Sequence, residues 1–404
     1  MNRVVITGMG SISALGHDAA QCWAAMKAGH SGIGPIRNIP VERLKMAIGA
    51  EVRDYNPDEE FERKQVALYD RVSQFAMTAA REAIAQSGLS FEGGFGARTA
   101  AILGSGIGGQ TTIDEGYQKL YGDNVARVHP FTIPRLMINA PVSHLSIAYG
   151  VTGPSFVVAS ACASANHAIA ITFDMVRRGV VDAAITGGTE APMTVGVIKS
   201  WEAMRVMSPD TCRPFTKDRR GMVLGEGAGV FVIETLDHAK ERGARIIAEI
   251  AGTGMSSDAH DIVQPSEAGA INAMRKALED AGMSPADIDY VNAHGTGTQA
   301  NDVTETRAIR QIFGKDADRI PVSSTKSMHG HALGAAGALE LVAVVGALTE
   351  GIVPPTANFT EADPECDLDY VPNTARKHEV RAALSNSFAF GGHNCVLALR
   401  QYRD

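Results

Sequence analysis

The chain has 404 residues, of which 45% are hydrophobic and 20% charged, a balance typical of a globular protein with room for about two or three domains. Its formal net charge of −8 argues against broad nucleic-acid binding, which requires a basic surface. Its five cysteines are scattered and odd in number, which fits a reducing cytoplasm and opposes both a disulfide framework and a zinc site.

Short apolar runs alternate with helix-length segments along the whole chain, as in a layered α/β fold. Strands are expected in RVVITGMG, RTAAILG, SFVVAS, VDAAITGG and AGVFVIET, and helices over 70–87 and from about 162 to 178. The series restarts beyond residue 250, which predicts two similar halves that break near Ala248–Gly254. The small-residue helices expected over 162–178 and 331–349 would be buried counterparts. The N-terminus lacks a signal-peptide pattern, and no run of about 18 uninterrupted apolar residues predicts a membrane span.

One cysteine falls where a predicted strand meets a predicted helix. In VVASACASANHAIAI, Cys162 is flanked by very small residues that leave room for a ligand. A helix starting at Cys162 would present unpaired N–H groups and the positive end of its dipole, which favour the thiolate. This pattern indicates a nucleophile, and a small core cysteine is the competing interpretation.

Two histidines supply the rest of a possible active site. NAHGTGT places His294 at the end of a strand beside a glycine turn, where α/β sheets carry their chemistry. STKSMHGHALGAAG places Lys326 ahead of His331, which would begin a small-residue helix and stay neutral because the helix dipole opposes imidazolium. A neutral imidazole can donate a hydrogen bond to an oxygen that gains negative charge. Each histidine alone is better explained as structural, but together with Cys162 they indicate catalysis.

Three further motifs have competing interpretations. GSGIGG over 104–109 matches the dinucleotide fingerprint, but no acidic residue ends a strand about 20 residues later, so close packing or pocket lining by Ile107 is favoured. His329 and His331 with His294 lack a carboxylate or cysteine at metal-ligand spacing, so no metal site is expected. SNSFAFGGHN suits an oxyanion hole, an aromatic gate or a plain hairpin turn.

Four ordered motifs carry a resemblance to a known family: the SACASA run, NAHGTGT, KSMHGHALGAAGALE and the FAFGG turn. They resemble the β-ketoacyl-acyl carrier protein synthases, most closely the elongating type II condensing enzymes, over essentially the whole chain. SACASANHAIA and SWEAMRVMSPDTCRPF resemble the nodulation-type ketosynthases of rhizobia. The resemblance implies a thiolase-like α/β fold with a duplicated αβαβα five-layer architecture. Residues 1–250 would form the half with the cysteine, and residues 251–404 the half with the histidines and lysine.

The resemblance also implies the chemistry. Cys162 would take an acyl chain as a thioester from the phosphopantetheine of an acyl carrier protein. His294 and His331 would hold the malonyl thioester carbonyl and promote decarboxylation, and the carbanion would extend the acyl chain by two carbons. Backbone N–H groups of Cys162 and Phe390 would stabilise the oxyanion. No metal and no cofactor of the protein's own are expected.

Supporting residues follow from the same resemblance. Lys326 would organise the site by pairing with Glu340, and Phe390 would gate the thiol together with a loop that includes Asp258. Ile107 would line the acyl pocket, and Thr132 stands where a phenylalanine of the partner subunit often closes it, which predicts tolerance of long or unusual acyl chains. Carrier docking is expected at four basic residues: Arg63, Lys64, Arg127 and Arg205. A cytoplasmic homodimer is expected, with a heterodimer as the alternative.

The same motifs distinguish several other functions. A non-catalytic chain-length partner of a polyketide synthase typically lacks the nucleophile that Cys162 supplies. A thiolase requires a second cysteine where this chain has FAFGGHN, and an initiating synthase of the Cys-His-Asn type lacks the pattern of Lys326 and His331. A ketosynthase of a type II polyketide, polyene or nodulation-factor pathway uses the same chemistry and stays open.

Overall fold

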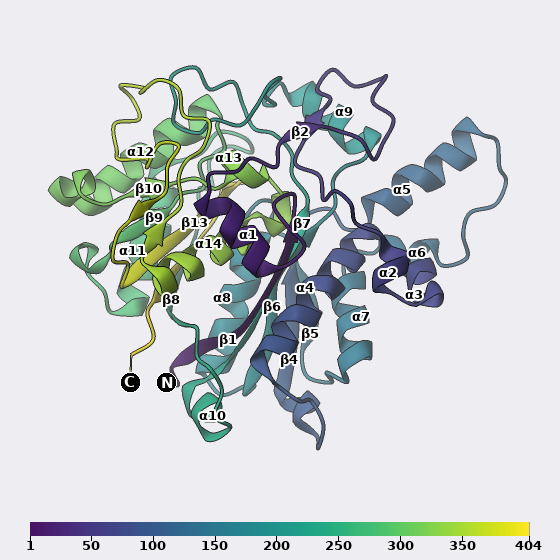
Figure 1. Cartoon of the computed structure of the whole chain (residues 1–404), viewed down its shortest axis with the longest axis horizontal. Coiled ribbons are helices and arrows are strands. Elements are labelled where there is room, and N and C mark those ends of the chain that lie inside the picture. Colours follow the sequence, from purple (N-terminus) through teal and green to yellow (C-terminus); the bar gives the residue numbers. More distant parts are fainter. Residues whose placement is uncertain (404) are drawn as a thin grey trace.

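The structure is a computed structural model that describes residues 1–403. Within that range, ten strands form one mixed sheet in the order β10-β9-β13-β14-β8-β1-β7-β6-β4-β5 (Figure 1). Their bounds are β1 Val4–Ser13, β4 Thr99–Gly104, β5 Ser155–Val158, β6 Ala183–Glu190, β7 Gly227–Thr235, β8 Ala248–Ser257, β9 Tyr290–Asn292, β10 Val322–Ser323, β13 Ala382–Ala389 and β14 His393–Arg400. Two short pairs lie apart from it: β2 Gly34–Pro35 with β3 Ile48–Gly49, and β11 Ile352–Val353 with β12 Arg376–Lys377.

The sheet consists of two sets of five strands with the same order and directions. In one set β4 is parallel to β5 and β6, and β7 is antiparallel to β6 and β1. In the other β9 is parallel to β10 and β13, and β14 is antiparallel to β13 and β8. The sets join through β1 and β8, which pair antiparallel only from Val4 to Ile6. The strand pattern of the first set is therefore repeated in the second.

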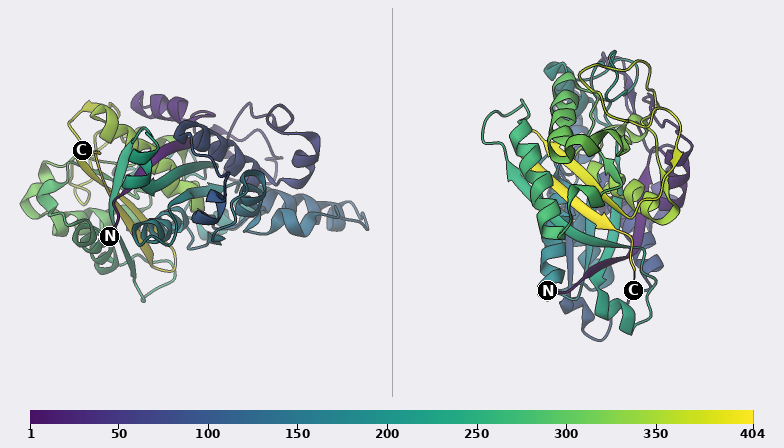
Figure 2. Two further views of the ribbon diagram at one scale, coloured as in Figure 1. Left: turned by 90° about the horizontal axis from the view of Figure 1, so that it is seen from below. Right: turned by 90° about the vertical axis from the view of Figure 1, so that its left-hand side faces the viewer.

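Helices cover both sets of strands and fill the space between them (Figures 1 and 2). Helices α4 (Arg71–Ser87) and α7 (Ala140–Tyr149) pack on the outer face of the first set, and α11 (Glu267–Ala281) and α12 (Gln299–Phe313) on that of the second. Helices α8 (Ser164–Arg177) and α14 (Ala336–Glu350) lie in the middle layer, in one core cluster with residues from both sets. The order of layers is the αβαβα arrangement expected from the sequence. The remaining helices are α1 Ala19–Lys27, α2 Pro57–Glu60, α3 Arg63–Leu68, α5 Gln110–Tyr117, α6 Thr132–Leu136, α9 Val195–Met204, α10 Leu236–Glu241 and α13 Lys326–His329.

Local signals explain where the outer helix α4 begins and ends. The Asp70 side chain accepts a hydrogen bond from the Val72 N–H at the start, as an N-cap should. Gly88 ends the helix in the left-handed region with φ 64°, which glycine adopts without strain. The helix expected over 70–87 is therefore confirmed within one residue.

Helix α14 is buried along nearly its whole length. Every residue from Ala336 to Leu348 is buried between the two sets of strands. By length and composition the stretch Leu333–Glu350 is apolar enough to cross a membrane, with a mean hydropathy of 1.5, but 89% of it is buried inside the protein. A helix that is apolar on all sides is the expected central element of such a layered core.

Candidate active site

Cys162 lies in a tight turn between β5 and α8. Ala161, just before it, has φ 49°, a left-handed conformation that is uncommon for a residue with a side chain. The hydroxyl of Ser164 fastens the turn because it donates to the Ala161 carbonyl at 2.6 Å and accepts the Ser160 N–H at 2.9 Å. The strand-to-helix junction is confirmed, but α8 begins at Ser164, two residues after the cysteine.

The free thiol is protonated at neutral pH. Burial raises the pKa of Cys162 to about 12, and Glu190 also raises it, whereas Lys326 and the backbone N–H groups of Cys162 and Phe390 lower it. Backbone N–H groups do favour the thiolate, as expected, but desolvation outweighs them, so the pKa of the free thiol is raised overall. The two backbone N–H groups expected to form the oxyanion hole thus lie beside the sulfur, next to the place where a thioester carbonyl would be attacked.

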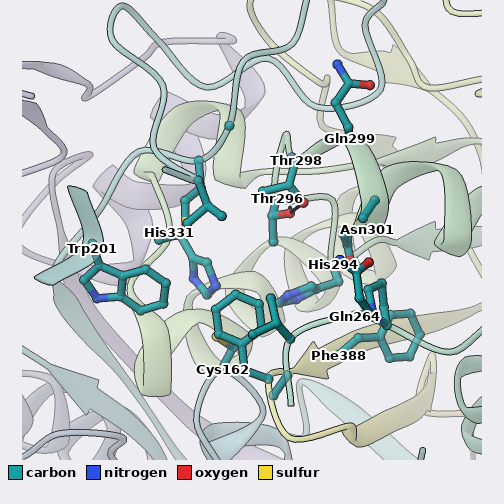
Figure 3. Close-up of a pocket in the computed structure, with 18 of the residues that line it drawn as sticks. Cys162, Trp201, Gln264, His294, Thr296, Thr298, Gln299, Asn301, His331 and Phe388 are labelled. Carbon is teal, nitrogen blue, oxygen red and sulfur yellow. Dashed lines mark hydrogen bonds between the residues drawn. The ribbon is translucent and has the colours of Figure 1, made fainter. Parts of the chain in front are cut away.

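His294 and His331 face each other beside this thiol, and both point into the same cavity as Cys162 (Figure 3). Their ring centroids are 5.5 Å apart, and the ring planes are nearly perpendicular at 84°. His294 follows β9, and His331 lies between α13 and a short 3-10 turn over Leu333–Ala335. Helix α14 starts only at Ala336, so His331 is not at its N-terminus as expected, because residues 332–335 first form this turn.

Hydrogen bonds assign the tautomer of each imidazole. Lys326 Nζ lies 3.2 Å from His294 Nδ1, and the Leu333 N–H donates to His331 Nδ1 at 3.2 Å. Because each Nδ1 accepts, each Nε2 carries the hydrogen and can donate it to a substrate. Burial, and next the charge of Lys326, hold the pKa of both histidines well below the ordinary value, so both rings are neutral. A neutral ring was predicted for His331, but its first cause is burial and not a helix dipole.

A buried ion pair organises this half of the site. Lys326, the first residue of α13, is fully buried and donates to Glu340 of α14, as expected, and to the His294 carbonyl oxygen at 2.6 Å. Glu340 is also fully buried, and desolvation raises the pKa of its carboxyl to about 7 although Lys326 lowers it. One ammonium thus fixes both the backbone and the ring of His294.

Two buried carboxylates that the sequence analysis did not single out hold the active-site loops. Glu305 of α12 accepts the N–H groups of His294 and Gly295, each at 2.8 Å. Glu190, the last residue of β6, accepts the N–H groups of Gly106 at 2.6 Å and Gly334 at 2.9 Å. The donors of GSGIGG therefore bind a carboxylate of the protein itself, which opposes the dinucleotide interpretation. A glutamate that ends an apolar strand, as in AAITGGTE, was the available signal.

The FAFGG turn lies next to the Asp258 loop. Gly391 and Gly392 have φ of 82° and 71°, the Asp258 N–H donates to the Gly392 carbonyl at 2.9 Å, and the Gly391 N–H donates to the Ile262 carbonyl at 2.8 Å. The Phe390 ring stacks on Trp201 with centroids 5.8 Å apart. The structure thus brings Phe390 and Asp258 together at the cavity wall.

The cavity has a volume of about 360 Å³. Cys162, His294 and His331 line it together with Trp201 and Phe388 (Figure 3). Behind the thiol, Cys162 belongs to an apolar cluster whose other members are Ile36, Met193, Ile198, Met207, Met222, Leu224 and Leu333, with Ile107 and Trp201 packed against it. Ile107 thus packs against the same apolar cluster as Cys162, although it is not among the residues that line the cavity. Thr132, on α6, is placed elsewhere, with its hydroxyl donating to the His129 carbonyl at 2.6 Å.

The four predicted docking residues are not equivalent. Arg205 lines the cavity and is exposed at its mouth, beside Arg220, which the sequence analysis missed. Arg63 and Lys64 on α3 and Arg127 are exposed but are not among the residues that line the cavity.

The histidines do not form a metal centre. Among residues 1–403, no group of three His, Cys, Asp or Glu side chains could hold an ion. His329 is fully buried with its Nε2 at 3.0 Å from the Thr325 hydroxyl, and burial lowers the pKa of its ring to about 3. His329 is therefore part of the core around α13.

A thiol beside two neutral imidazole donors, in a layered α/β fold with repeated strand order, defines the thiolase-like class of acyl-transferring enzymes. Residues 1–239 match the N-terminal domain of beta-ketoacyl synthases and residues 247–360 match their C-terminal domain, so the chain belongs to the beta-ketoacyl synthase family.

Relatives and solved structures agree with this assignment. The chain is 51% identical to nodulation protein E of a Rhizobium species over 399 residues, which cover 99% of each chain. It is 41% identical to 3-oxoacyl-[acyl-carrier-protein] synthase 2 of Staphylococcus aureus over 407 residues, covering 99% of this chain and 98% of the relative. The ishigamide ketosynthase/chain length factor superposes with a TM-score of 0.94 at 36% identity, over 100% of both chains. The protein is therefore an elongating condensing enzyme of the type II class with a thiolase-like fold.

The buried ion pair gives a first prediction. Lys326→Met or Glu340→Leu alone should lower the free energy of unfolding by about 3–5 kcal/mol, because each leaves a buried ionisable group without its partner. The double variant should recover most of that loss but not condensation activity, because His294 Nδ1 still lacks its donor. Urea unfolding and product formation measure the two effects. The matched control is Lys217→Met, which breaks an exposed pair with Glu361 and should change neither. Recovery of activity in the double variant would show that Lys326 does not act through His294.

Proposed function

We propose that Cys162 is the nucleophile and that His294 and His331 stabilise the charge formed on decarboxylation. One observation carries this proposal: the Nε2–H groups of His294 and His331 lie in the same cavity as the thiol of Cys162. Metal-free decarboxylation requires neutral donors aimed at an enolate oxygen, and both imidazoles are held neutral by burial.

The reaction then has two halves. In the first, the Cys162 sulfur attacks the carrier-bound acyl carbonyl, the carrier's C–S bond breaks, and the thiol proton passes to the departing pantetheine thiolate. In the second, the malonyl C–C bond breaks and CO2 leaves, while the electron pair remains as an enolate held by His294 and His331. The enolate carbon attacks the acyl thioester, and the Cys162 thiolate leaves and takes up a proton. The N–H groups of Cys162 and Phe390 face the oxyanion in both attacks.

We infer that the product is a specialised acyl chain. The higher identity to nodulation protein E than to 3-oxoacyl-[acyl-carrier-protein] synthase 2, 51% against 41%, supports this. A threonine at position 132, where the family often has a phenylalanine, also favours a longer cavity in an assembled dimer. Housekeeping fatty-acid elongation and a type II polyketide or polyene pathway are the alternatives, since the chemistry at Cys162 is the same.

The experiment that tests the roles separates the two half-reactions. Intact mass spectrometry after incubation with acyl-carriers of graded length should show one acyl adduct, absent in Cys162→Ala. His294→Ala and His331→Ala should still form the adduct but release CO2 from malonyl-carrier about 10²–10³-fold more slowly, because each removes one donor to the enolate oxygen. An adduct that survives in Cys162→Ala would refute the nucleophile. An adduct confined to medium-length chains would refute the predicted tolerance of long acyl chains.

An acyl carrier protein is the proposed partner. Arg205 and Arg220 form a basic mouth on the cavity of a chain whose net charge is −8, and a local basic patch is what an acidic carrier requires. The relative named 3-oxoacyl-[acyl-carrier-protein] synthase 2 supports this partner.

Charge reversal tests the docking surface. Arg205→Glu or Arg220→Glu should raise the KM for the acyl-carrier at least about tenfold at low salt and much less at high salt, because exposed charges are screened. The KM for acyl-pantetheine, which lacks the carrier protein, should not change. Lys315→Glu is the control for a general effect of the added negative charge and should leave the KM for the acyl-carrier unchanged. Arg127→Glu should raise this KM as Arg205→Glu does if Arg127 contacts the carrier. An unchanged carrier KM in both mouth variants would remove Arg205 and Arg220 from this surface.

We also propose a homodimer through the edge of the sheet at β5. This strand is at the end of the sheet with its first two residues exposed, and unpaired edges are normally covered. Large apolar side chains are exposed nearby, on or close to β5, α5, α6 and α7: Tyr117, Tyr121, Phe131, Ile133, Met137, Ile147 and Phe156. A face of this kind marks a protein interface, and a second copy of the chain is the occupant we propose.

Light scattering with size-exclusion chromatography tests this dimer. Ile147→Asp with Phe156→Asp should give a monomer, because each places a charge in an apolar interface. Met255→Asp, at an exposed apolar residue on β8 in the middle of the sheet order and away from the β5 edge, should stay dimeric. A wild-type protein that is monomeric until a second, different ketosynthase-like chain is added would favour the heterodimer instead.

A further inference from the structure

Glu190 is a buried carboxylate to which the condensation steps above give no role. Its side chain is fully buried, and it accepts four hydrogen bonds: from Ser105 Oγ at 2.9 Å and from the N–H groups of Gly106, Gly334 and Ile107 at 2.6, 2.9 and 3.3 Å. These donors come from two loops far apart in the sequence. One follows β4 and carries Ile107, and the other follows His331.

The two loops contact each other at the carboxylate. A Cβ atom placed on Gly334 would lie 2.4 Å from the Gly106 nitrogen and 2.5 Å from Glu190 Oε2. Such distances are too short for any side chain, so the glycine is required for the close approach. Glu190 therefore joins the loop at the acyl pocket to the loop at the histidine.

Each loop carries a group that the reaction uses. Leu333 belongs to the apolar cluster around Cys162, and its N–H is the donor that holds His331 Nδ1. Leu333 has φ 45°, a strained conformation that persists only where surrounding contacts hold it. One such contact is made by the following residue, because the Gly334 N–H donates to Glu190. On the other loop, Ile107 packs against the same cluster. A shift of the carboxylate would therefore move both the imidazole donor and the pocket wall.

We infer that Glu190 is a positioning residue, which fixes His331 for decarboxylation and the Ile107 loop for selection of the acyl chain. This inference rests on the proposed roles of Cys162 and His331. A misplacement of about 1 Å in a group that contacts the reacting atoms costs about 10²-fold in rate, so a hydrogen bond that sets the position of the His331 loop has a measurable effect. Acyl transfer to Cys162 does not involve the His331 donor and is expected to depend on Glu190 only through the shape of the pocket.

The test uses two variants that disturb the same contact from opposite sides. Glu190→Gln presents an NH2 group to backbone donors, and Gly334→Ala keeps the carboxylate but displaces it. Both should lower the kcat for CO2 release from malonyl-carrier at least about tenfold with little change in KM. Acylation of Cys162 by a short acyl-carrier should stay within about twofold of wild type, whereas the ratio of long-chain to short-chain acylation should change.

Two matched controls and a stability measurement complete the design. Glu249→Gln changes another buried carboxylate, one that binds Arg3 and Arg400 at 2.7 Å far from the cavity, and Gly116→Ala changes a helical glycine with nothing within 4 Å. Both should react as wild type. Urea unfolding identifies any variant that is not folded, and if Glu190→Gln is unfolded the result rests on Gly334→Ala.

The outcomes separate the two levels of the proposal. If the wild-type protein forms no acyl adduct, the proposed function fails. If wild type reacts but both half-reactions are unchanged in Glu190→Gln and Gly334→Ala, or fall by the same factor, Glu190 is structural and the inference is wrong. A selective loss of decarboxylation with an altered chain-length ratio supports it.

Discussion

The site depends on a single fully buried positive charge, the ammonium of Lys326. Lys326 Nζ contacts Glu340, the His294 carbonyl and His294 Nδ1, so its three hydrogens have three acceptors. A buried ammonium is costly unless it is paired and fully hydrogen-bonded, and this requirement fixes the positions of all three partners. Because Glu340 belongs to α14 and His294 follows β9, the same charge also ties the central helix to the second set of strands.

Burial, and next this charge, set the protonation of the surrounding groups. Burial and Lys326 keep both imidazoles neutral, and Lys326 partly offsets the rise in the pKa of Cys162 that desolvation causes. The free site therefore holds a neutral thiol and two neutral donors. Negative charge arises only on substrate atoms or on the departing sulfur, where the donors already point, so little reorganisation is needed during the reaction.

Sequence reasoning found the reactive residues because their types and local patterns are unusual. Cys162 among alanines, His294 in a glycine turn and Lys326 ahead of His331 were all recognisable, and the structure brings them together. It located helix starts less well: α8 and α14 begin two and five residues after the cysteine and the histidine. The left-handed Ala161 and the turn over Leu333–Ala335 cause this delay, and alanine and leucine carry no signal for either conformation.

The protonation states and the hydrogen-bond partners of buried charged groups were harder still to predict. The dipole argument agreed with the neutral ring of His331, but it did not decide the protonation of Cys162, because burial opposes the charged form of both groups more strongly. Glu190 and Glu305 were missed because a glutamate in an apolar segment does not reveal which distant N–H groups it accepts. Their donors lie 84 and 11 residues away for Gly106 and His294 and are known only once the fold brings them together.

The repeated strand order explains why this site lies between the two sets of strands. The glycine loop of Ile107 follows β4, and the glycine loop of His294 follows β9, the strand in the same place of the other set. Cys162 follows β5 as Lys326 follows β10, and Glu190 ends β6 as Phe390 follows β13. The carboxyl ends of three parallel strands from each set thus meet over the helices of the middle layer. Because the first set supplies the thiol and the second the proton-bearing donors, nucleophile and donors keep their relative position only while the middle layer holds the sets together. Glu190 belongs to the first set and accepts the N–H of Gly334, which follows His331. This hydrogen bond directly connects the two halves of the site.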